Sequence, residues 1–239
     1  MPVPTFRLLV VPGVTVDKWS RLWSERLPEV DLQVVPAEAG QAAAAVLDAQ
    51  VDAGLARLPV DPDAFHAIPL YTEATVVVVP RDHLLTAAGE LTLADLAGEP
   101  LVLPLDDVLT WTVAPATVAT GRPDTTAAAV ELVAAGVGVL VVPQSLARLH
   151  HRRDLTYRVV TDAPTSSVAL VWPRDRHTDL VEEMIGIVRG RTANSTRGRT
   201  QEPPLPTRTP PTRPAPPPHD PSARRASTTP RRPPRRRGR

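Results

Sequence analysis

Small polar residues and one arginine stand where predicted strands give way to helices or turns. Gly13, Val14 and Thr15 lie between a first apolar run and an amphipathic stretch, and Arg57 and Pro59 end a later apolar run. The amino end of a helix presents free backbone N–H groups and a positive dipole, which favour anions. Arginine can bind a carboxylate through two hydrogen bonds. These residues predict a site for a small anionic molecule, and the simpler alternative is that Thr15 caps its helix and Arg57 lies in solvent.

The second half of the chain offers further candidates of the same kind. Asp106 follows a short apolar segment, and Gln144 follows a predicted strand. Thr125 and Thr126 open an apolar-faced helix. Threonine and glutamine can donate hydrogen bonds to an anion, whereas an aspartate would suit an amine-bearing ligand. The alternatives are that the threonines cap the helix and that Asp106 lies in a solvated loop, and the sequence leaves both explanations open.

Known catalytic and metal-binding patterns are absent from the sequence. It holds no Gly-x-Ser-x-Gly, phosphate-loop, dinucleotide-binding or His-Glu-x-x-His pattern. It holds no cysteine, which excludes disulfide bonds, cysteine-ligated zinc and a thiol nucleophile. His150 and His151 are adjacent and would point apart on a helix. We therefore expect no enzymatic activity, no metal and no cofactor.

The net charge of +1 averages two unlike parts of the chain. Residues 190–239 hold 13 arginines, 13 of the 29 prolines and only 2 acidic residues, a net charge of +11. The preceding 189 residues hold 14 basic and 24 acidic residues, a net charge of −10. A segment so poor in apolar residues is predicted to be a disordered tail. Its arginines could contact nucleic acid non-specifically, associate with the acidic part of the chain, or be dispensable.

No apolar stretch approaches the ~20 residues that a membrane-spanning helix needs. The first residues lack the basic segment and the cleavage site of a signal peptide. We therefore expect a cytoplasmic protein without membrane contact.

Apolar runs and helical periodicities alternate through residues 1–189, which predicts an α/β domain with short right-handed crossovers and mainly parallel sheets. Gly136 is expected to end a helix, and Gly138 to permit close packing where the next strand begins. The expected strands are residues 6–11, 30–35, 52–58, 66–70, 75–79, 101–103, 139–142, 155–160 and 168–172. The expected helices are residues 16–27, 41–50, 92–96, 125–135, 145–150 and 179–188.

Five segments, in order, resemble the effector-binding (substrate-binding) domain of LysR-type transcriptional regulators. They are RLPEVDLQVV, DAGLARLPV, IPLYTEATVVVVPRDHLL, LTLADLAGEPLVLP and ELVAAGVGVLVVPQS. Order and spacing agree from about Phe6 to Val188, although Leu84 stands where the family usually has proline. The last segment, with its Ala-Ala-Gly-x-Gly core, matches most closely.

The resemblance implies a two-lobe fold of the periplasmic-binding-protein type (type 2) over residues 1–189. The chain would cross between lobes near 78–81 and 168–172. Lobe one would comprise residues 5–79 and 168–189, and lobe two residues 80–167. The stretch from Leu103 to Thr125 is shorter than usual in the family, so we expect a shortened second lobe.

The resemblance also implies that the chain senses a small anionic metabolite in transcriptional regulation. Too few residues precede Phe6 to form the family's helix-turn-helix domain, so we expect no sequence-specific DNA contact by this chain. The implied partners are the small-molecule effector and either a second copy or a full-length LysR-type regulator. The alternatives are a cytoplasmic solute-binding protein without a regulatory role, a remnant that binds nothing, and an enzyme of the same fold, for which Thr126 and Lys18 are the only candidates.

Overall fold

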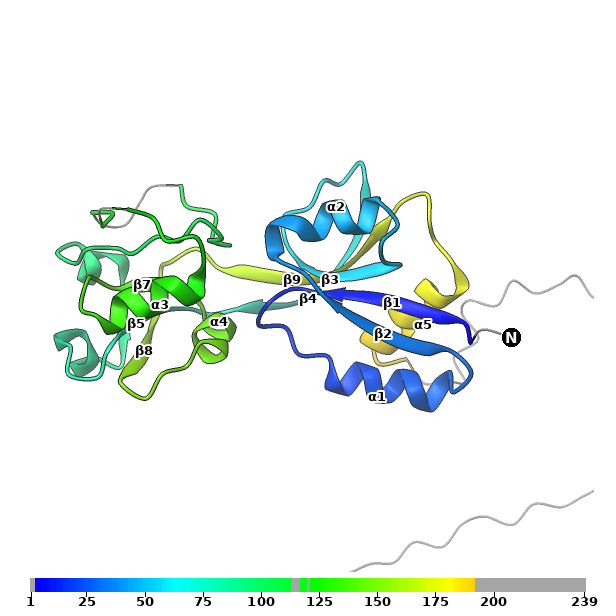
Figure 1. Ribbon diagram of the computed structural model, residues 1–239, viewed down its shortest axis with the longest axis horizontal. Helices are drawn as coiled ribbons and strands as arrows, with labels where there is room; N and C mark the ends of the chain where they lie inside the picture. The colour runs from blue at the N-terminus through cyan, green and yellow to red at the C-terminus, as the bar shows by residue number, and fades with distance from the viewer. Residues whose placement is uncertain (1–2, 113–116, 120, 192–239) are drawn as a thin grey trace, which may run out of the picture. The chain divides into compact units, whose positions relative to one another are not determined.

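The computed structural model describes residues 3–112, 117–119 and 121–191, and its strands form two sheets (Figure 1). The tail that is predicted to be disordered lies, from residue 192 onward, outside the described residues. The first sheet has the spatial order β2 (Asp31–Pro36), β1 (Thr5–Val10), β3 (Ala53–Arg57), β9 (Ser166–Pro173) and β4 (Phe65–Glu73). The second has the order β6 (Glu90–Leu91), β8 (Leu155–Val160), β5 (Thr75–Pro80) and β7 (Leu140–Pro143).

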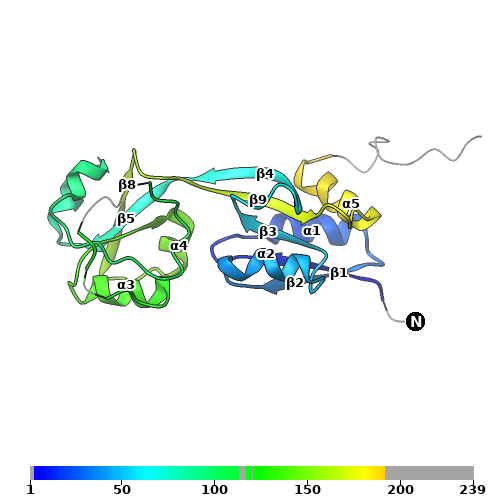
Figure 2. The ribbon, with the colours of Figure 1, turned by 90° about the horizontal axis from the view of Figure 1, so that it is seen from above.

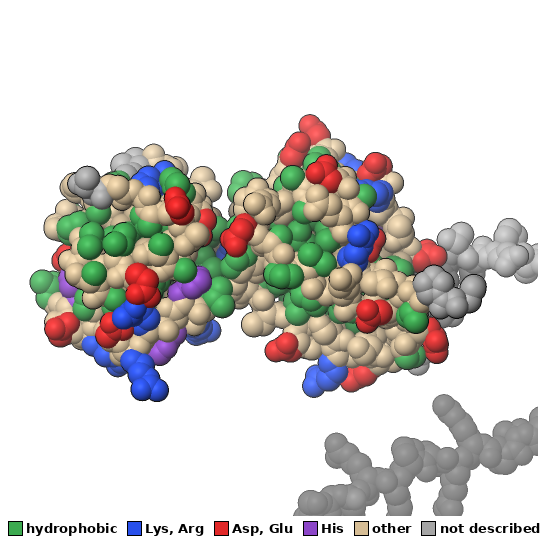
Figure 3. All heavy atoms as spheres, in the orientation of Figure 1, with side chains coloured by type: hydrophobic (Ala, Val, Ile, Leu, Met, Phe, Trp, Pro, Cys, Tyr) green, Lys and Arg blue, Asp and Glu red, His purple; other side chains and the backbone are tan. Residues whose placement is uncertain are grey.

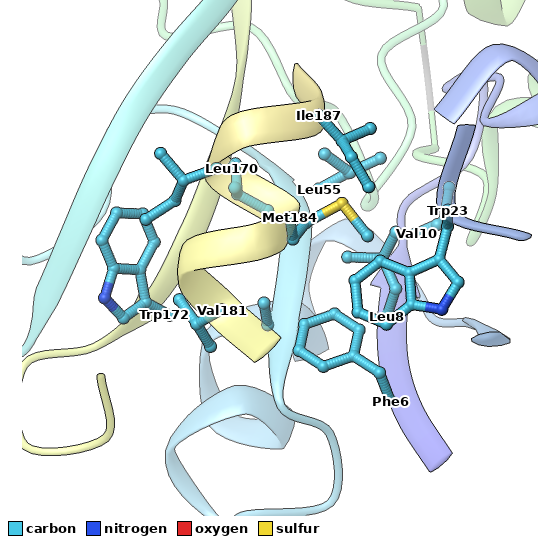
Figure 4. Packing of buried hydrophobic residues seen from close by; sticks show 12 residues of the cluster. Phe6, Leu8, Val10, Trp23, Leu55, Leu170, Trp172, Val181, Met184 and Ile187 are labelled. Carbon is cyan, nitrogen blue, oxygen red and sulfur yellow. The ribbon is translucent and has the colours of Figure 1, made fainter. Parts of the chain in front are cut away.

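Helices cover both faces of the first sheet, and we call this assembly the first lobe. On one face, α1 (Asp17–Arg26) and α5 (Asp179–Val188) pack against alternate residues of β1, among them Phe6 and Leu8. Figure 4 shows Met184 of α5 facing this cluster. On the other face, α2 (Ala42–Leu47), which follows the 3-10 turn Ala39–Gln41, packs against the intervening residues of β1. Alternate residues of a strand face opposite sides, so the apolar run in β1 supplies both cores.

The second sheet is covered in the same way and forms the second lobe. One face carries α3 (Thr126–Ala134) and α4 (Gln144–Leu149), and the other carries the 3-10 helices η2 (Leu84–Ala87) and η3 (Leu93–Leu96). The valine run of β5 is buried throughout because both faces are covered. The two-lobe α/β fold is therefore confirmed.

The sheets are mixed, and the expectation of mainly parallel sheets is wrong. β1 runs parallel to β2 and β3, and β6 to β8. β9 runs antiparallel to β3 and β4, and β5 antiparallel to β7 and β8. The reason is the return of the chain: β9 comes back from the second sheet and enters the first from the opposite end. Figure 2 shows β4 and β9 side by side.

For several short segments the structure differs from the expectation, and for one it agrees. β5 pairs only with strands of the second sheet, so the first crossing lies at Ala74, earlier than expected. Residues 101–103 are not a strand, because only Leu101 makes isolated bridges. Thr15 is not a helix cap, since α1 has Val16 at that position without a side-chain bond. Among residues 104–124, those that the structure describes contain no helix, in keeping with a reduced second lobe.

Candidate functional site

The turn between β1 and α1 is the first part of the candidate site. Gly13 has φ +85°, the left-handed conformation that glycine adopts without strain. Val14 packs into the first lobe, and its N–H donates to the carbonyl of Val11 at 3.3 Å. Thr15 is exposed. Since no side chain caps α1, the N–H groups of its first turn remain available to a ligand.

Arg57, at the end of β3, lies at the centre of a buried polar cluster. Its Nη1 donates to Glu73 Oε2 and to Ser166 Oγ, both at 2.8 Å. Its Nη2 donates to the carbonyl of Pro12 and to Ser145 Oγ, both at 3.2 Å. The arginine and glutamate side chains are only 5% and 9% exposed. The four terminal N–H groups of Arg57 are thus all engaged, whereas its buried Nε has no partner among the described residues. Arg57 is therefore not a solvated residue, and its role as a carboxylate ligand stays a prediction.

Ser145 brings the second lobe to this cluster. Its hydroxyl donates to Glu73 Oε2 at 2.9 Å, and the N–H of the preceding Gln144 donates to the carbonyl of Ala74 at 2.9 Å. A Cβ atom on Gly13 would lie 2.5 Å from Ser145 Oγ, so the turn and α4 are in close contact. The structure therefore brings together the predicted residues Gly13, Arg57 and Gln144, with Thr15 two residues beyond the point of contact.

The phenol of Tyr71 adds a neutral polar group near the ion pair. Tyr71 and Glu73 lie two residues apart on β4 and so share a side of the strand. Partial burial raises the pKa of Tyr71, the Glu73 carboxylate raises it further, and Arg57 lowers it. The phenol therefore remains a hydrogen-bond donor at neutral pH.

The remaining predicted site residues lie elsewhere. Asp106 accepts hydrogen bonds from the N–H and the hydroxyl of Thr126, both at 2.9 Å. Thr125 caps α3 by accepting from the N–H of Ala128 at 3.2 Å, so its predicted capping role is confirmed. Pro59 is exposed, after a cis peptide bond. These contacts give Asp106, Thr125 and Thr126 a structural task, and their role in ligand binding stays a prediction.

Glu73 and Ser166 were not expected to belong to the site. Each ends or begins a strand beside a crossing between the lobes, and neither stands at a strand-to-helix junction. The one available signal was Glu73 itself, the single charged residue within the run 67–79. Ser145, by contrast, follows Gln144 directly and shares its junction.

Asp107, next to Asp106, predicts a pH dependence of stability. Its carboxylate accepts from the N–H of Leu109 at 3.0 Å and from Trp111 Nε1 at 2.8 Å, but burial outweighs these bonds and raises its pKa. The folded state therefore keeps this proton to higher pH than the unfolded state, and the resulting stability is lost as pH rises through the folded pKa. Urea unfolding from pH 3.5 to 7 should show the stability of the natural protein, relative to Asp107→Asn, falling with pH.

Asp95 provides the matched control of opposite sign. Hydrogen bonds from the backbone and hydroxyl of Thr92 lower its pKa. Its stabilising effect is present above the unfolded pKa and is lost as pH falls. Relative to Asp95→Asn, the natural protein should therefore gain stability with rising pH, and the same slope for both comparisons would contradict the argument.

The chain matches the family model described as the LysR substrate binding domain over residues 6–193. It belongs to the LysR substrate-binding domain family. This confirms the resemblance that its sequence motifs carry.

Curated relatives of this LysR substrate-binding domain are transcriptional regulators. The HTH-type transcriptional regulator AlsR of Bacillus subtilis (strain 168) is 24% identical over 195 residues, covering 76% of this chain and 62% of that protein. The probable hydrogen peroxide-inducible genes activator of Mycobacterium leprae (strain TN) is 31% identical over 162 residues, covering 64% and 50%. The chain thus spans about half to three fifths of the length of these relatives.

Solved structures of LysR effector-binding domains share the fold. The BenM effector-binding domain with its effector benzoate superimposes with a TM-score of 0.67 at 19% identity, covering 78% of this chain and 91% of that one. The oxidised form of OxyR gives a TM-score of 0.65 at 22% identity, covering 78% and 94%. At such identities these likenesses establish the fold alone.

Proposed function

We propose that this LysR substrate-binding domain senses a small-molecule effector and thereby serves transcriptional regulation. The observation that carries the proposal is the meeting of the turn 12–15, the Arg57–Glu73 pair and the amino end of α4, which joins both lobes at one point. Ligand sites in α/β folds lie at the carboxyl ends of strands and the amino ends of helices. The relatives named as regulators, and the benzoate held by BenM, support the same conclusion.

The contacts that we assign to the effector are those with unused hydrogen-bonding groups or open surface. Gly13, Val14 and Thr15 offer the turn and the uncapped start of α1, and Gln144 offers its amide from the second lobe. A helix amino end favours a carboxylate, so a small carboxylic acid is the proposed class. Arg57 acts one step removed, because its Nη2 donates to the carbonyl of Pro12 and holds the turn.

The proposal extends to the way in which the chain acts. Its relatives are transcriptional regulators, and we infer that it acts in the cytoplasm without catalysis, as an effector-binding domain paired with a second copy or with a full-length LysR-type regulator. None of the described helices is long and apolar enough to cross a membrane. On the face shown in Figure 3, Lys and Arg side chains are dispersed among acidic and neutral groups, which does not favour DNA contact there.

A thiol-based response to peroxide is excluded for the residues of this chain. Several relatives are named as probable hydrogen peroxide-inducible genes activators. A disulfide or sulfenic acid requires cysteine, and the chain has none. This favours reversible binding of an effector over oxidation of a thiol.

A thermal-shift screen of the full chain against small aromatic and aliphatic carboxylic acids, with benzoate included, tests the proposal. A ligand at about 100 times its dissociation constant should stabilise the folded state by about 2.7 kcal/mol. We expect Thr15→Ala to reduce the shift and Thr125→Ala, an exposed threonine at the start of α3, to leave it unchanged.

The reverse pattern would move the site to α3 and contradict the assignment to the turn. A screen in which none of these acids shifts the melting temperature would contradict the proposal that the chain senses a small carboxylic acid. It would favour the alternatives, a remnant or a domain that only contacts other proteins.

A further inference from the structure

The two lobes are connected by crossing segments that lie against one another. One crossing is Ala74, between β4 and β5, and the other is the segment 161–165, between β8 and β9. The hydroxyl of the buried Thr75 donates to the carbonyl of Pro164 and ties the two crossings together. Two adjacent crossings form a hinge about which the lobes can rotate, because few backbone torsions have to change.

Next to this hinge, one serine hydroxyl of the second lobe is bonded to a buried ion pair of the first. Ser145 Oγ donates to Glu73 Oε2 at 2.9 Å and accepts from Arg57 Nη2 at 3.2 Å. Hydrogen bonds to charged groups in a buried setting are stronger than those between neutral groups. Contact at the same point also depends on Gly13, since a side chain there would collide with Ser145.

We propose that Ser145 and the Arg57–Glu73 pair form a hinge clasp, which sets the angle between the lobes and couples it to the effector turn. The coupling follows from Arg57 Nη2, which serves both the carbonyl of Pro12 and the hydroxyl of Ser145. An effector that displaces the turn therefore changes the bond that holds the second lobe. Because the clasp lies beside the hinge, a small shift there becomes a large displacement at the far ends of the lobes.

The coupling rests on the proposed function, whereas the clasp itself does not. The clasp is tested on the full chain without any added effector. The chain contains no cysteine, so the pair Gly40→Cys and Gly98→Cys accepts two spin labels at defined positions, one in each lobe. Both glycines have open space around them and no left-handed backbone, so we expect these substitutions to leave the fold intact. Double electron–electron resonance then measures the distribution of distances between the labels.

Ser145→Ala in this labelled background should shift and broaden the distance distribution, because both bonds of the hydroxyl are lost while alanine preserves α4. Ser167→Ala is the matched control: its hydroxyl is hydrogen-bonded to that of Thr72 at 2.8 Å, within the first sheet and outside the cluster around Arg57. This control should leave the distribution unchanged.

An unchanged distribution in Ser145→Ala would overturn the clasp, and so would an equal change in Ser167→Ala. Either result would leave the effector-sensing proposal standing, since that is judged by the ligand screen. Conversely, a ligand screen in which no compound binds would leave the distance measurement valid as evidence for the clasp.

Discussion

Arg57→Met is expected to lower the free energy of unfolding by about 3–5 kcal/mol, the usual cost of leaving one partner of a buried ion pair alone. The Glu73 carboxyl group would lose its arginine at a position where the side chain is 9% exposed, with only the hydroxyl of Ser145 to satisfy it. Methionine nearly preserves the volume of arginine, so the loss reports the unpaired charge rather than a cavity. Urea denaturation at pH 7, compared with the natural protein, measures it.

The double variant Arg57→Met/Glu73→Met separates the unpaired charge from the value of the pair. Replacing both partners of a buried pair by apolar residues is often neutral or stabilising. We therefore expect the double variant to recover most of the lost stability. If Arg57→Met lowers the free energy of unfolding by less than about 1 kcal/mol, the pair behaves like a solvent-exposed ion pair. That result would contradict its burial.

Gly138→Ala is expected to destabilise the protein by about 3 kcal/mol, the upper end of the usual cost of overpacking. A Cβ atom on Gly138 would lie 2.1 Å from the carbonyl oxygen of Pro100, and backbone cannot move aside as a flexible side chain can. The same oxygen accepts from the N–H of Val139 at 2.9 Å, so a shift would also break this bond at the start of β7. Chemical or thermal unfolding measures the loss.

Two other glycines provide graded controls. Gly136 has φ +75° and open space around it, so Gly136→Ala should cost about 1–2 kcal/mol, from the left-handed backbone alone. Gly98 has open space and no left-handed backbone, so Gly98→Ala should lie within about 0.5 kcal/mol of the natural protein. Equal costs at Gly136 and Gly138 would contradict the collision with Pro100.

The sequence by itself determined the elements whose signals are local. The apolar periodicity of residues 179–188 predicted α5 with its true ends, and the run 155–160 predicted β8. Gly136, which ends α3, and Gly138, which permits a close approach, were correctly interpreted because each position is limited by its own backbone and nearest neighbours. Five ordered motifs were enough to predict the family.

Only the tertiary structure decided which distant residues meet. Arg57 donates hydrogen bonds to Glu73, Ser145 and Ser166, which lie 16, 88 and 109 positions later in the chain. No local pattern marks such pairs, because they form where a chain that has left the first sheet returns to it. The same return made β9 antiparallel, against the expectation from short crossovers. Local propensity thus set the elements, whereas the path of the chain between two sheets set the site.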